Sequence, residues 1–69
     1  MNLNLDFRTL KYKHINDKWY VLYEMTKEMW AVVVYAEDEE DILFSSVELD
    51  YATAIHKYNQ IKDNPSEYL

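Results

Sequence analysis

Two apolar runs decide the fold of this chain: KWYVLYEM at residues 18–25 and MWAVVVYA at residues 29–36. Both runs are dense in aromatic and β-branched residues, which favour strands, and only the polar residues 26–28 separate them. The sequence therefore predicts a β-hairpin with a short connection at the centre of the molecule.

The chain before this hairpin predicts a further strand. Residues 3–13 alternate between apolar and polar side chains, and the alternation changes phase near Arg8 and Thr9, which indicates a β-bulge or bend. Asn16 and Asp17 then supply a turn, because both side chains can hydrogen-bond nearby backbone and both residues tolerate left-handed conformations. The turn leads directly into the central hairpin.

The chain after the hairpin predicts a fourth strand. Residues 37–41 read EDEED and are too charged to pack in a core. Residues 42–46 are mainly apolar and suit a strand, which could extend as far as Glu48. The acidic run is therefore expected to form the connection between the last two strands.

One helix is predicted after the strands. Asp50 is suited to the N-cap position, and the helix should end near Pro65, because the residue before a proline is pushed out of helical geometry. A capping box made by Ser45 and Glu48 would instead start the helix several residues earlier. The apolar residues at helical spacing form one stripe: Tyr51, Ala54, Ile55, Tyr58 and Ile61.

These elements predict a single α+β domain over residues 1–69. The expected architecture is ββββα, an antiparallel meander of three to four strands with one C-terminal helix packed on one face, and residues 64–69 are a candidate flexible tail. A core of this size contributes only about 3 to 5 kcal/mol of net stability. Self-association is therefore expected to supply more.

The composition excludes several classes of function. The chain has no cysteine, which removes thiol nucleophiles, disulfides and iron–sulfur clusters and leaves His14 and His56 as the strongest nitrogen ligands. It also has no glycine, although an average chain of this length contains about five. Phosphate-binding loops and nucleophile elbows need glycine, so neither is expected. The histidines fall into no metal or catalytic motif, and we expect no enzymatic activity and no cofactor.

The net charge of −6 is unevenly distributed. Residues 1–34 carry five basic and four acidic side chains, whereas residues 35–69 carry two basic and nine acidic ones. A negative chain repels phosphate backbones, which disfavours nucleic-acid binding. The longest apolar run, residues 29–36, is too short to span a bilayer, and the first residues do not resemble a secretory signal. We therefore expect a cytoplasmic protein that does not enter the membrane.

The central hairpin is apolar on both of its faces, and one helix can cover only one of them. The uncovered face is expected to be a protein interface, with a second copy of the chain favoured over an unidentified protein. An alternative is that the N-terminal strand and the tail at residues 64–69 fold over this face. The residues assigned to the interface are Trp19, Tyr20, Leu22, Trp30, Val32 and Val34.

Two charged segments offer further hypotheses. The acidic residues Glu37, Asp38, Glu39, Glu40 and Asp41 form either an acidic loop that docks on a basic protein or a hairpin tip that only keeps the chain in solution. The basic residues Arg8, Lys11, Lys13 and Lys18, interleaved with aromatic side chains, are candidate nucleic-acid contacts.

The sequence therefore favours a small acidic interaction module, expected to be a homodimer, that regulates or inhibits a larger protein. A nucleic-acid-handling protein of a host cell, targeted by a chain that a virus or mobile element encodes, would suit the acidic loop. The alternatives are a nucleic-acid-binding module and a purely structural subunit.

Overall fold

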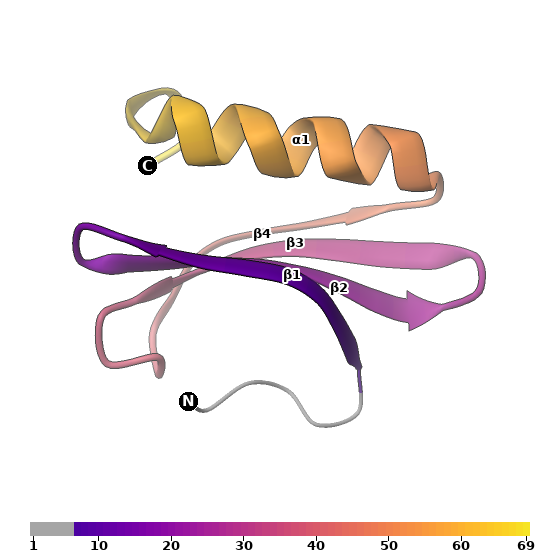
Figure 1. Ribbon diagram of the computed structural model, residues 1–69, viewed down its shortest axis with the longest axis horizontal. Helices are drawn as coiled ribbons and strands as arrows, with labels where there is room; N and C mark the ends of the chain where they lie inside the picture. The colour runs from indigo at the N-terminus through magenta and orange to yellow at the C-terminus, as the bar shows by residue number, and fades with distance from the viewer. Residues whose placement is uncertain (1–6) are drawn as a thin grey trace.

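The computed structural model describes residues 7–69, in which four strands form an open antiparallel sheet and a helix follows (Figure 1). Each strand pairs with its neighbour in sequence, so the spatial order is β1-β2-β3-β4. This confirms the predicted ββββα meander. The elements are β1 (Arg8–Ile15), β2 (Lys18–Thr26), β3 (Met29–Ala36), β4 (Ile42–Glu48), α1 (Tyr51–Asp63) and a short 3-10 helix η1 (Pro65–Glu67).

The turn and the bulge of the first hairpin lie where the sequence predicts them. Asn16 and Asp17 connect β1 to β2, and Asn16 has a φ of 57°, a left-handed conformation that asparagine tolerates better than most residues. The register between β1 and β2 shifts between Thr9 and Lys11, which places the bulge at Leu10. The part of the predicted strand at residues 1–6 lies outside the described residues.

The start of α1 is fixed by its cap. The Asp50 carboxylate accepts hydrogen bonds from the backbone N–H of Thr53 at 2.9 Å and from its hydroxyl at 3.0 Å. The helix ends at Asp63, before the proline, as predicted. The alternative start at a capping box is wrong, because Ser45 and Glu48 lie within β4 and pair with β3.

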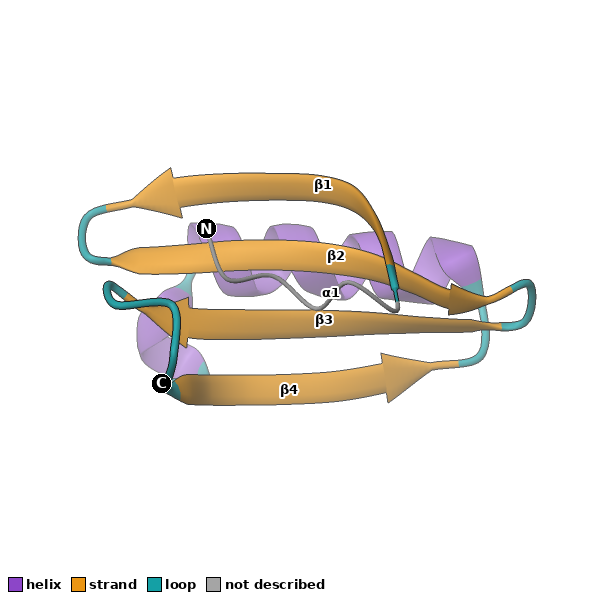
Figure 2. Ribbon diagram, turned by 90° about the horizontal axis from the view of Figure 1, so that it is seen from below, coloured by secondary structure: helices purple, strands orange, loops and turns teal. Residues whose placement is uncertain are grey.

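The helix covers one face of the sheet and runs behind β2 and β3 in Figure 2. Side chains from the two central strands alternate between the faces, and those on the helix side are closed off from solvent by the apolar stripe of α1. This cluster is the main core, and its buried members are Tyr20, Leu22, Val32, Val34, Ala54, Tyr58 and Ile61.

The opposite face of the central hairpin is also buried. The Tyr23 and Tyr35 hydroxyl groups lie 2.8 Å apart and share a hydrogen bond there. Partly buried side chains of Phe7, Trp19 and Met25 pack against this second cluster. Its buried members, Val21, Tyr23, Ala31, Val33 and Tyr35, therefore do not form the open apolar surface that the sequence suggested.

The tail packs on the helix side of the sheet. The Tyr68 ring contacts Phe44 with ring centroids 5.8 Å apart, and its hydroxyl donates to Gln60 Oε1 at 3.3 Å. Residues 64–69 therefore do not cover the second face, because η1 turns them back along α1 instead.

Candidate functional site

Five exposed apolar side chains lie along β4 and at the start of α1. Within residues 7–69, only two other large apolar side chains, Tyr12 and Leu69, are exposed. We call these five residues the β4 strip. They are Ile42 (60% exposed), Leu43 (45%), Val47 (51%), Leu49 (76%) and Tyr51 (44%).

The position of β4 in the sheet explains this exposure. Because β4 is the last strand of the meander, it has a neighbouring strand on one side only within the part of the chain that the structure describes. Val47 lies opposite Ala31 of β3, on the face turned away from α1. Ser46 and Glu48 lie on the helix side, where Ser46 Oγ donates to Glu48 Oε1 at 2.7 Å. Lys57 of α1 reaches the same carboxylate at 3.6 Å, so the only acidic residue of β4 already has a partner of opposite charge.

The two edges of the sheet differ in how they are protected. The β1 edge carries Lys11 and Lys13 and has a bulge at its third residue, Leu10, features that discourage another strand from pairing. β4 contains no lysine, arginine or proline, and its irregularity at Leu43 lies near its first residue. The segment from Phe44 to Glu48 is therefore a regular, unprotected strand edge.

Most of the interface residues expected from sequence belong to the core. Tyr20, Leu22, Val32 and Val34 are buried beneath α1, so they are not available to a partner in this fold. Trp30 lies on the same face, partly buried, with its ring 6.0 Å from that of Tyr51. The six residues are thus not one exposed surface, because the helix covers the face on which five of them lie.

Trp19 is the sixth of these residues and lies on the second face. Its indole stacks on the His14 imidazole with ring centroids 4.3 Å apart, and the Tyr12 ring lies 6.2 Å away. The indole Nε1 is shielded from solvent and has no hydrogen-bond partner among residues 7–69. Trp19 is therefore held mainly by ring contacts within its own chain.

The acidic loop, residues 37–41, is an ordered tip between β3 and β4. Asp38 Oδ1 accepts hydrogen bonds from the backbone N–H of Glu40 at 2.9 Å and, more weakly, from that of Asp41 at 3.4 Å. Glu37 Oε2 is 2.8 Å from His14 Nε2 on β1. The loop therefore uses one carboxylate to fold its own backbone and another to contact β1, on the far side of β2.

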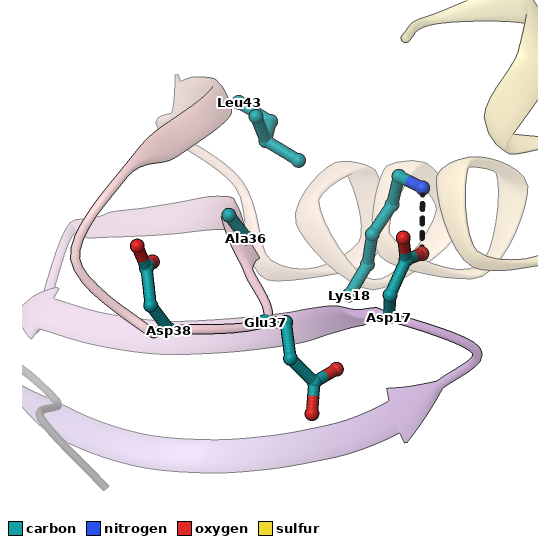
Figure 3. Close-up of a pocket in the computed structure, with 6 residues that line it drawn as sticks. All are labelled: Asp17, Lys18, Ala36, Glu37, Asp38 and Leu43. Atoms are coloured by element: carbon teal, nitrogen blue, oxygen red, sulfur yellow. Dashed lines mark hydrogen bonds and ion pairs between the residues drawn. The ribbon is translucent and has the colours of Figure 1, made fainter.

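An open pocket of about 430 Å³ lies where the acidic loop meets the turn between β1 and β2 (Figure 3). Lys18 Nζ donates to Asp17 Oδ1 at 3.0 Å, and this hydrogen bond lowers the pKa of Asp17 below its ordinary value of 3.8. The lining residues are Asp17, Lys18, Ala36, Glu37, Asp38 and Leu43. Within the described part of the chain, no group of three or more side chains is arranged to hold a metal ion.

A second depression, of about 380 Å³, separates β1 from the last turns of α1. Three ammonium groups border it, and we call it the lysine groove. Two of them, Lys11 and Lys13, are among the predicted nucleic-acid contacts, whereas Lys18 is paired with Asp17 in the first pocket. Arg8 lies opposite Glu24 near the start of β1. The lining residues are Leu10, Lys11, Tyr12, Lys13, Tyr58, Asn59 and Lys62.

Comparison with known proteins gives no relative: no family model, no curated protein and no solved structure matches this chain. Among residues 7–69, α1 is the longest helix, and no helix has the length and apolarity needed to cross a bilayer.

Proposed function

We propose that the chain is a small, non-enzymatic protein-interaction module, acting in the cytoplasm, whose binding surface is the free edge of β4. The observation that supports this proposal is the coincidence of an unprotected strand edge with the β4 strip. Five of the seven large apolar side chains that are exposed among residues 7–69 follow one another along this edge, and exposed apolar side chains that cluster in this way are typical of protein-binding surfaces.

Strand addition is the mode of binding that suits this edge. A partner strand placed beside β4 would hydrogen-bond the backbone groups that β3 does not use, and these bonds supply affinity without depending on sequence. Side chains of the strip, such as Val47 and Leu49, would then be removed from water. The apolar contacts would supply the selectivity for one partner.

The neighbouring acidic loop would influence which proteins bind. Residues 37–41 directly precede β4, so a partner strand on this edge ends close to five carboxylates. Basic partners would be attracted over a distance set by ionic strength, and their association rate would fall as salt is added. A module that covers such a surface on a larger protein would regulate or inhibit it.

A photo-crosslinking experiment tests this proposal. Val47 is replaced by a photoreactive phenylalanine derivative in cells that naturally produce the chain, and Tyr12 on the opposite edge carries the same group as the matched control. We expect protein adducts from position 47 and few from position 12, with the adducts lost when Leu49→Lys is added. Equal labelling from both positions would refute the assignment of the surface.

The lysine groove favours a second candidate function, the binding of single-stranded nucleic acid. Lys11, Lys13 and Lys62 border it, and a groove lined by cations can follow the phosphates of a single strand. Fluorescence anisotropy of a labelled oligonucleotide at low salt tests this candidate. It predicts binding that Lys11→Glu weakens and that Lys27→Glu, away from the groove, leaves unchanged; no binding at high micromolar protein discards it.

A further inference from the structure

We propose that the partner of the β4 edge is a second copy of the chain, whose own β4 pairs with it in antiparallel orientation around a two-fold axis. The two sheets would then join into one continuous sheet of two copies. This inference rests on the proposed function, because it names the occupant that the same edge has in the free chain; a larger target protein would displace this second copy.

The difference between the two sheet edges limits such an assembly to two copies. β4 has no side chain that opposes pairing along Phe44 to Glu48, whereas Lys11, Lys13 and the bulge at Leu10 obstruct β1. Pairing of β4 with β4 uses the same surface on both copies and closes the assembly. The obstructed β1 edges would form the ends of the joined sheet, so a fibre would not grow.

Charge selects the antiparallel orientation. Each copy has a net charge of −6, and its acidic loop lies at the start of β4. Parallel pairing would bring the two acidic loops side by side. Antiparallel pairing places them at opposite ends of a seven-residue strand, about 20 Å apart, which exceeds the screening length of about 8 Å at physiological ionic strength. The remaining carboxylate of the strand, on Glu48, is paired with Lys57.

A second copy also brings the apolar side chains that the edge needs. In an antiparallel pair the first half of one strand lies beside the second half of the other, so Ile42 and Leu43 approach the end of the partner strand, near Val47 and Leu49. The strips of both copies would then contact each other. A foreign protein would have to present an equivalent strand.

Light scattering on a sizing column tests this inference with the purified chain from low micromolar to millimolar concentration. We expect the mass to rise from 8.4 kDa to twice that value. Val47→Lys should keep the chain at the monomer mass, while the matched control Tyr12→Lys, on the β1 edge, should leave the dimer unchanged. Circular dichroism would establish that both variants fold, which is expected because both side chains are exposed.

Single cysteine variants test the geometry, since the chain has no cysteine of its own. Ser45→Cys is expected to form a disulfide-linked dimer under mild oxidation at least tenfold faster than Asn59→Cys on the exposed side of α1. A dimer that persists in Val47→Lys overturns the inference. Equal rates of cross-linking in Ser45→Cys and Asn59→Cys also overturn it. A wild-type chain that stays monomeric also overturns it, but position 47 would still cross-link to another protein if the proposed function is right.

Discussion

The imidazole of His14 lies flat against the indole of Trp19, with ring centroids 4.3 Å apart and the two planes inclined by 3°. The same imidazole is 2.8 Å from Glu37 through Nε2. Because His14 lies on β1 and Glu37 follows β3, these two contacts connect the β1 edge to the acidic loop across β2.

Loss of this connection should destabilise the fold. We expect His14→Ala to lower the free energy of unfolding by about 1 kcal/mol, from the lost ring stacking and the lost hydrogen bond to Glu37. Chemical denaturation measures the change. His56→Ala is the matched control, since His56 is exposed on α1 and its replacement should change stability by less than about 0.5 kcal/mol. Equal losses in the two variants would contradict a structural role for the stack.

Two buried phenols should limit stability at alkaline pH. Burial raises the pKa of both Tyr20 and Tyr58 above the ordinary value of 10.0. The unfolded chain therefore releases these protons at a lower pH than the folded chain does. The stability that the two protonated phenols contribute is complete below about pH 10 and is lost as the pH rises through their folded pKa values. Denaturation at pH 8 and pH 11 measures the loss. Tyr58→Phe should reduce it, whereas Tyr12→Phe, with an exposed ring, should not.

The Tyr23 and Tyr35 hydroxyl groups should show coupled effects on stability. Tyr23→Phe removes the partner of the buried Tyr35 hydroxyl, and a buried polar group without its hydrogen bond costs about 1 to 3 kcal/mol. The loss in free energy of unfolding in the double variant should therefore be smaller, by about 1 kcal/mol, than the sum of the losses in Tyr23→Phe and Tyr35→Phe. A double-mutant cycle in denaturant measures this coupling, and strict additivity would show that the two hydroxyls act independently.

The Asp50 cap should account for a measurable part of helix stability. Asp50→Ala removes the acceptor for the Thr53 N–H, and we expect a loss of about 1 kcal/mol. Asp50→Asn should restore most of it, because asparagine is an equally good cap. Asp63→Ala, at the other end of α1, is the control and should cause no loss. Thermal melts of the three variants provide the comparison.

The regular elements could be predicted from the sequence because local signals agree with the fold. The central hairpin is bounded by polar residues, Asp50 caps the helix, and the helix ends before Pro65. The bulge was expected near Arg8 and Thr9, and the structure places it one residue later. Each of these features depends on residues that are close together in the chain.

The covered face and the exposed surface could not be predicted in the same way. Val32 and Val33 are equally apolar, so the alternation of β3 does not indicate which face receives α1. Because of this ambiguity, the sequence pattern predicts an interface at Tyr20 and Leu22, which the structure places in the core. The β4 strip was missed, although one signal was present: the last strand of a meander is an edge, so Val47 has no neighbour beyond it.

The order of the strands also has a consequence for folding. In the described part of the chain, each strand pairs with a strand next to it in sequence, so no contact within this sheet requires the closure of a long loop. Chains with such local connectivity fold faster than those with distant pairings. We expect the hairpin of β2 and β3, which is buried on both faces, to form first during folding, and the outer strands to separate first when the sheet opens.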